Sequence, residues 1–202
     1  MTFNNTILEK NPILNADGSP MRTTQEDYIV LFNNSYKIMA SLADYYNAGK
    51  YDDDLLLEGL QEDFSNWVVT SDREIHNYNS LEASIISYYG SKVVEPFERK
   101  FTIAPFTNGP SLDKVLSTKE GIVYLQNIFN TKDTKDEILT TLIRLSGTDS
   151  HYISIWNRGL CRKREMEQTS FLIYEKPDFY IFGCDACHSK GRAREVKLVV
   201  EK

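Results

Sequence analysis

The chain of 202 residues has few of the side chains, and none of the short motifs, on which many common catalytic sites depend. It contains only three cysteines and three histidines. No Gly-rich phosphate loop, Gly-x-Ser-x-Gly elbow or His-Glu-x-x-His pair occurs in it. The sequence therefore lacks the usual motifs of phosphate-binding loops, serine hydrolases and zinc proteases.

Long apolar runs are missing as well. No stretch approaches the roughly 18 apolar residues that a membrane-spanning helix needs. The N-terminal segment has no basic region followed by an apolar one, so it does not read as a secretory signal. We therefore expect a cytoplasmic protein with no membrane partner. In that reducing compartment, cysteines are free thiols or metal ligands rather than disulfides.

Charge is unevenly distributed along the chain. Residues 1–100 carry 8 basic and 16 acidic side chains, whereas residues 151–202 carry 10 basic and 7 acidic ones. A nucleic-acid contact is therefore expected only through the basic C-terminal part, and the alternative is an ordinary solvated surface. The candidate residues for that contact are Arg158, Arg162, Lys163, Arg164, Lys190, Arg192 and Arg194.

Apolar residues recur every three or four positions in several segments, which is the period of an amphipathic helix. Capping residues, namely Thr23, Asp52, Ser117 and Thr134, lie at or next to the start of four of these segments. The spacing predicts three helices and then a helix pair, over residues 23–49, 51–69, 80–94, 118–129 and 134–146.

From His151 onward the period changes to that of β-strands. The runs HYISIW, TSFLIYE, DFYIFG and REVKLVVE are rich in β-branched and aromatic residues and are separated by turn-forming segments. Helices first and strands last predict an α+β fold with a small, mostly antiparallel C-terminal sheet. The Pro/Gly-containing stretch 100–111 is the expected boundary between an acidic helical region (23–100, after a partly disordered leader 1–22) and a C-terminal part (112–202).

The C-terminal sequence FGCDACHSKGR places two cysteines and a histidine within five residues. Such a loop favours a structural zinc ion over haem attachment or a redox pair, since there is no export signal and no βαβ setting. Three free, partly buried thiols are the alternative. Zinc needs four ligands, and the candidates are His151, Cys161, Cys184, Cys187 and His188.

The same region contains Pro177 and Asp178, followed seventeen residues later by Glu195 and then Lys197. This spacing resembles the Pro-Asp … Glu-x-Lys motif of the PD-(D/E)xK nucleases. The resemblance implies Mg²⁺ held by Asp178 and Glu195 on adjacent strands, with Lys197 positioning the attacking water. The alternative is a plain hairpin turn at residues 175–178.

Two further patterns point to binding rather than catalysis. The helix pair followed by a strand pair with the tip Asn-Arg-Gly has the order of a winged helix-turn-helix, whose wing would carry the basic run beginning at Arg158. The tyrosine pairs 45–46 and 88–89 cannot all face the inside of one helix, and exposed tyrosines favour a protein partner. We therefore expect a non-catalytic regulatory, adaptor or inhibitor protein, with the metal-dependent nuclease as the alternative.

Overall fold

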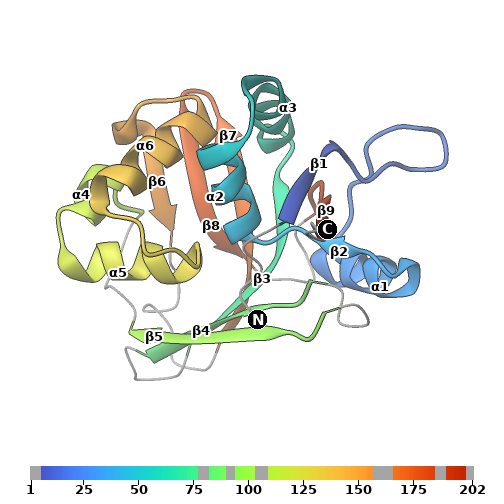
Figure 1. The fold of residues 1–202 in the computed structure, drawn as a ribbon, viewed down its shortest axis with the longest axis horizontal. Helices are drawn as coiled ribbons and strands as arrows, with labels where there is room; N and C mark the ends of the chain where they lie inside the picture. The colour runs from blue at the N-terminus through green and yellow to red at the C-terminus, as the bar shows by residue number, and fades with distance from the viewer. Residues whose placement is uncertain are drawn as a thin grey trace.

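The computed structural model describes residues 6–76, 82–89, 94–102, 109–156, 166–184 and 190–198. Strands occur throughout this described chain, before, between and after the helices, and they form two sheets (Figure 1). The larger sheet has six strands and the smaller has three. The helices α2, α4, α5 and α6 lie together on one side of the larger sheet (Figure 1).

The six-stranded sheet has the spatial order β5-β4-β3-β7-β8-β6, and its neighbours are antiparallel except for the parallel pair β6 and β8. Strands β3 and β7 are its long central members. The strands are β3 (Val68–His76), β4 (Glu82–Ser87), β5 (Phe97–Thr102), β6 (Ile153–Trp156), β7 (Met166–Glu175) and β8 (Asp178–Cys184).

The three-stranded sheet joins segments from the two ends of the described chain. Its central strand is β9 (Arg194–Leu198), which pairs in antiparallel fashion with both β1 (Thr6–Pro12) and β2 (Ile38–Met39). Leu8, Ile38 and Val196 all face the main hydrophobic core. This small sheet is therefore part of the same core as the helices.

The helices are capped as their sequences predict, with small shifts of the starting residue. Thr134 and Glu137 form the expected capping box, and Gly147 ends that helix in the left-handed conformation, with φ of 69°. The helices are α1 (Gln25–Ser35), α2 (Leu42–Tyr51), α3 (Asp54–Phe64), α4 (Leu112–Leu116), α5 (Lys119–Ile128) and α6 (Lys135–Ser146), with one 3-10 turn, η1 (Ser150–Tyr152).

The predicted order of helices first and strands last is wrong. The segment 80–94, expected to be helical, contains strand β4, and Ile85 lies between Glu74 of β3 and Arg99 of β5 in the ladder. The long helix expected over 23–49 is interrupted by Tyr36, whose φ of 54° ends α1, and by the short strand β2. Tertiary strand pairing has overridden the local helical period in both places.

Gly49 was expected to end a helix, yet it lies inside α2. A β-carbon at this position would approach the β-carbon of Leu145 at 2.9 Å and the carbonyl oxygen of Thr141 at 3.2 Å. Glycine is therefore required because α2 and α6 cross closely here. Helix α2 is buried from other sides as well: the Tyr45 ring packs against Phe64 of α3 and the Tyr46 ring against Phe129, and both tyrosines are inaccessible to solvent.

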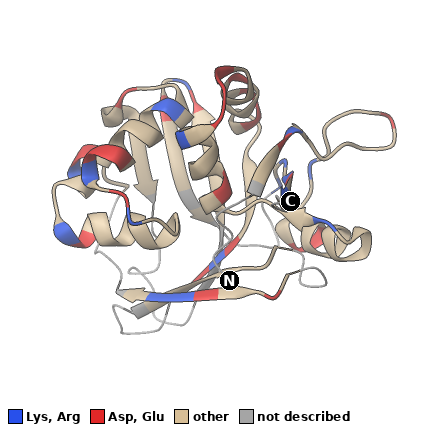
Figure 2. Ribbon diagram, viewed as in Figure 1, with Lys and Arg blue, Asp and Glu red and all other residues tan. Residues whose placement is uncertain are grey.

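The acidic N-terminal half and the basic C-terminal segment meet in ion pairs. Acidic residues lie along α3 and in the first turn of α6, as Figure 2 shows. The Asp63 carboxylate accepts hydrogen bonds from Arg192 at 2.8 Å and from Arg194 at 2.8 Å and 2.5 Å. At the surface, Lys197 pairs with Glu9 at 2.7 Å.

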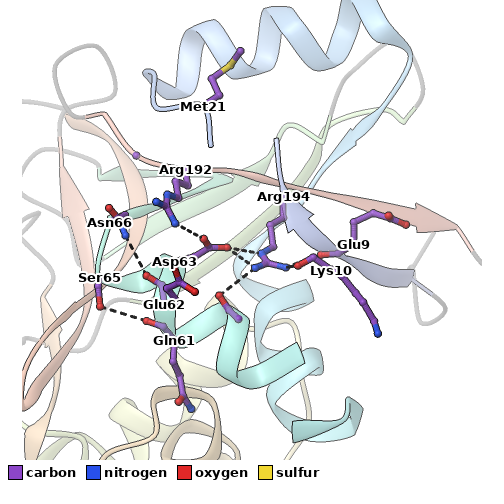
Figure 3. A network of polar contacts seen from close by, with 12 residues as sticks. Glu9, Lys10, Met21, Gln61, Glu62, Asp63, Ser65, Asn66, Arg192 and Arg194 are labelled. Atoms are coloured by element: carbon purple, nitrogen blue, oxygen red, sulfur yellow. Dashed lines mark hydrogen bonds and ion pairs between the residues drawn. The ribbon is translucent and has the colours of Figure 1, made fainter. Parts of the chain in front are cut away.

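Arg194 connects three elements through this network (Figure 3). It is 2% exposed, and besides Asp63 of α3 it donates to the carbonyl oxygens of Glu9 and Lys10 in β1 and of Gly59 in α3. A buried ion pair is costly to break because the remaining charge stays desolvated. The network therefore fixes β9 and β1 against α3.

We expect Asp63→Asn to lower the free energy of unfolding by about 3–5 kcal/mol, because two guanidinium groups lose their carboxylate in a buried setting. Urea denaturation followed by circular dichroism measures this change. Glu9→Gln is the matched control, since it makes the same chemical change in a partly exposed pair and should cost less than about 1 kcal/mol. Equal losses in the two variants would contradict the structural role of Asp63.

Candidate functional site

The predicted zinc ligands fall mostly outside the described residues. Cys161, Cys187 and His188 are not among them, and Cys184 is described only through its backbone at the end of β8. His151 is exposed in η1, just before β6. Within the described ranges, no three or more His, Cys, Asp or Glu residues form a group that could hold a metal ion. Zinc binding by the cysteine loop stays a prediction.

The parallel pairing of β6 with β8 separates His151 from Cys184. Ile153 pairs with Phe179, so His151 lies two residues before this pair and Cys184 lies five residues after it. The five positions of β8 from Phe179 to Cys184 correspond to roughly 16 Å, at about 3.3 Å per residue, and His151 lies in η1, before the opposite end of this paired segment. The structure therefore does not bring His151 to the end of the sheet where Cys184 lies.

The three residues of the nuclease-like motif lie in two different sheets. Asp178 begins β8 in the six-stranded sheet, whereas Glu195 and Lys197 belong to β9 in the three-stranded sheet. Glu195 pairs with Lys37 at 2.6 Å, and Lys197 pairs with Glu9. Asp178 and Glu195 are thus not on adjacent strands, as a shared Mg²⁺ would require. The plain hairpin at residues 175–178 is confirmed, since Glu175 pairs with Asp178.

Seven residues are predicted to contact nucleic acid, and four of them lie outside the described residues: Arg158, Arg162, Lys163 and Arg164. Arg192 and Arg194 turn their guanidinium groups to Asp63, whereas Lys190 is exposed. The expected wing does not form from β6 and β7, because β6 pairs with β8 and β7 pairs with β3 and β8.

A pocket that sequence reasoning did not find lies between α2, β5 and the connection from α5 to α6. Its volume is about 790 Å³, which is within the range of roughly 300–1,000 Å³ typical of small-molecule sites. Its lining is mostly polar and includes several side-chain amides. The residues are Leu8, Ala43, Asp44, Asn47, Ala48, Lys50, Tyr51, Asp52, Tyr89, Phe97, Arg99, Gln126, Asn127, Asn130, Thr131, Lys132 and Asp133.

One wall of the pocket is fixed by Asp133. Its carboxylate accepts a hydrogen bond from Lys50 at 2.6 Å and from the Tyr46 hydroxyl at 2.8 Å. These bonds outweigh the effect of partial burial and lower the pKa of Asp133 below its ordinary value. Gln126 donates to the Asp133 carbonyl oxygen at 2.9 Å. The connection between α5 and α6 is therefore held against α2 by paired groups.

Arg99 of β5 is the unusual member of the pocket lining. It is only 8% exposed, and its three guanidinium nitrogens are inaccessible to solvent and have no hydrogen-bond partner. The nearest carboxylate, Asp72, is 3.9 Å away between Nη2 and Oδ1, which is too long for a hydrogen bond. An unsatisfied buried donor costs about 1–3 kcal/mol, and more when it is charged.

Asp72 of β3 lies beneath the start of α2 and is fully buried. Its carboxylate accepts hydrogen bonds from the backbone N–H of Leu42 and from the Ser87 hydroxyl. Burial raises the pKa of Asp72 to about 6, although Arg99 and these two donors act in the opposite direction. The carboxylate is thus held mainly by the backbone of α2 and by β4.

The sequence contains one local signal for this site. Phe97, Arg99 and Phe101 occupy alternate positions of β5 and point to the same face of the strand. Phe101 packs against Tyr124 of α5 with ring centroids 5.7 Å apart, so this face is turned to the core. A charged residue between two inward-facing aromatic residues could have marked Arg99, had the strand been recognised.

Comparison with known proteins finds no relative whose site could be compared with this pocket. No family model, curated protein or solved structure matches the chain. Among the described residues, no helix is both long and apolar enough to cross a membrane.

The raised pKa of Asp72 predicts a specific pH dependence of stability. Because the folded state holds the proton up to about pH 6, whereas an ordinary aspartate releases it near 3.8, the free energy of unfolding should rise as pH falls from about 6 to about 4. A shift of this size corresponds to about 3 kcal/mol. Asp72→Asn should lack this contribution, so on going from pH 6 to pH 4 its free energy of unfolding should gain about 3 kcal/mol less than that of the wild type, which urea denaturation at a series of pH values measures.

Asp17→Asn is the matched control. The hydrogen bonds from Ser19 lower the pKa of this exposed carboxylate, so it titrates below the pH window of interest. Its removal should leave the difference between pH 4 and 6 unchanged. If Asp72→Asn keeps the wild-type pH profile, Asp72 does not titrate near pH 6.

Proposed function

We propose that this chain is a non-catalytic binding protein that receives a small ligand in the pocket between α2 and β5. The observation that carries the proposal is the presence in that pocket of a buried guanidinium without a hydrogen-bond partner. Buried polar groups in folded proteins are almost always satisfied, and exceptions occur at functional sites. A ligand that accepts hydrogen bonds would satisfy Arg99.

The charged groups around the pocket support binding rather than bond chemistry. Asp133 is committed to Lys50 and Tyr46, and Asp44 is committed to capping α2 through Ser41 at 2.6–2.8 Å. Because Asp133 and Asp44 already form hydrogen bonds that fix the pocket walls, they keep the pocket in a preformed shape. A preformed pocket loses less conformational entropy when it binds.

We further propose a regulatory or adaptor role in which a protein partner contacts the chain in the cytoplasm. Tyr36 and Tyr51 are 71% and 73% exposed, and exposed tyrosines are enriched at protein interfaces. Tyr51 also lines the pocket, so a ligand bound in the pocket would change the surface that a partner contacts at Tyr51. A nucleic-acid contact through the basic C-terminal part also stays a proposal, based on the charge of residues 151–202, although Arg192 and Arg194 pair with Asp63.

The pocket can be tested by filling it. Asn47→Trp places an indole on the pocket side of α2 and should abolish binding of any small molecule held there. The probes are acetate, inorganic phosphate, methylamine and glucose, measured singly by isothermal titration calorimetry. At least one should bind the wild type and not the variant.

Asn34→Trp is the control for the pocket-filling variant, because it introduces the same side chain at an exposed position of α1. This variant should bind the same probes as the wild type. The proposal fails if none of the four probes binds the wild type, or if binding persists in a folded Asn47→Trp protein.

Structural zinc in the cysteine loop also stays a proposal, based on the spacing of Cys184, Cys187 and His188. Elemental analysis of the purified protein should then find about one zinc per chain. A double variant, Cys184→Ser with Cys187→Ser, should lose both the metal and thermal stability, because structural zinc contributes folding energy. Wild-type protein that purifies without metal and keeps its stability on exposure to a chelator would exclude zinc.

A further inference from the structure

We infer that Arg99 binds the oxyanion of a small ligand, a carboxylate or a phosphate group, in the pocket between α2 and β5. The inference rests on the proposed binding function and names the chemical class of its ligand. A guanidinium presents donors in a planar fork that matches two oxygens of a carboxylate or phosphate. Arg99 has all of these donors unused.

The closest acidic side chain does not fill this role. Asp72 is 3.9 Å from Arg99 and already accepts from Leu42 N–H and the Ser87 hydroxyl. Its contact with Arg99 is therefore a longer-range attraction, which offsets part of the desolvation of the guanidinium but leaves the donors without acceptors.

The other carboxylates near the pocket are also engaged. Asp44 accepts from the backbone N–H and the hydroxyl of Ser41, and Asp133 accepts from Lys50 and Tyr46. Asp52 is half-buried, and burial raises its pKa. These negative charges face an incoming anion, but two of the three accept hydrogen bonds from protein donors, whereas the Arg99 guanidinium donates no hydrogen bond to any acceptor.

The surroundings of Arg99 strengthen its attraction for an anion. The guanidinium carbon is 5.6 Å from the centre of the Phe97 ring, and the nitrogens are shielded from water. In such a low-dielectric setting, a charge-assisted hydrogen bond is less screened than at the surface. Because the nitrogens are shielded, ligand binding requires the Arg99 side chain to turn toward the pocket space, while the walls held by Asp44 and Asp133 stay in place.

The remainder of the pocket suits a polar, uncharged body attached to the anionic group. Asn47, Asn127 and Asn130 line it with side-chain amides, and Lys132 adds a further donor. Amides both donate and accept hydrogen bonds. The ligand class is therefore a small, hydrophilic carboxylate or phosphate monoester, rather than an apolar molecule.

The test uses the whole chain with ¹⁵N-labelled arginine and records the side-chain Nε–Hε signals during titration. Inorganic phosphate and acetate are the probes, and sodium chloride at equal ionic strength is the blank. We expect one probe to shift the Arg99 signal, which is identified by its loss in Arg99→Lys. Whichever of phosphate and acetate binds more tightly identifies the anionic group.

Two substitutions then separate anion recognition by the guanidinium fork of Arg99 from attraction by its positive charge alone. Arg99→Lys keeps the positive charge but loses the fork, and should weaken binding of the tighter probe at least about tenfold. Arg22→Lys, an exposed arginine outside the pocket, is the matched control and should bind as the wild type does. Circular dichroism verifies that both variants are folded.

The outcomes distinguish this inference from the proposed function. If glucose or methylamine binds the wild type and is blocked by Asn47→Trp, while neither anion shifts the Arg99 signal, the pocket binds a ligand of another class and the inference is overturned. Unchanged anion affinity in a folded Arg99→Lys protein also overturns it. If no probe binds at all, the proposed function fails together with the inference.

Discussion

The ion-pair network of Asp63 with Arg192 and Arg194 is the interaction on which the arrangement of the other elements depends. It joins β9, near the C-terminal end of the described chain, to α3 and to β1 near the N-terminal end. Local contacts cannot bring such distant segments together. Because Arg194 is buried, it binds only in a geometry that satisfies its donors, and this requirement specifies one placement of the small sheet.

That placement has consequences for the pocket. Leu8 of β1 is at once part of the core and part of the pocket lining, and α2 contacts both β1 and α6. The crossing of α2 with α6 at Gly49 positions Lys50 to reach Asp133. The walls of the pocket are therefore set by packing that extends well beyond it. A site supported by rigid elements in this way holds its shape without a ligand.

Local patterns in the sequence were sufficient for some elements and not for others. Helix α6 was predicted correctly because Thr134, Glu137 and Gly147 mark its two ends within the segment itself. Strand β4 was not predicted, because Ile85 and Ile86 fit the spacing of apolar residues in a helix as well as in a strand. Only the pairing with β3 and β5 decides between the two. Arg99 was missed for the same reason. Its pocket is assembled from segments near residues 47, 99 and 130, which no spacing rule connects.

Two buried arginines, Arg194 and Arg99, differ in whether the protein supplies acceptors for their hydrogen-bond donors. Arg194 is 2% exposed and has a carboxylate and three carbonyl oxygens as acceptors. Arg99 is 8% exposed and has none. The charge of Arg99 is partly offset by Asp72 at 3.9 Å, but its buried donors have no acceptors, and unsatisfied buried donors are destabilising. The cost of keeping Arg99 is explained if its acceptors belong to a ligand.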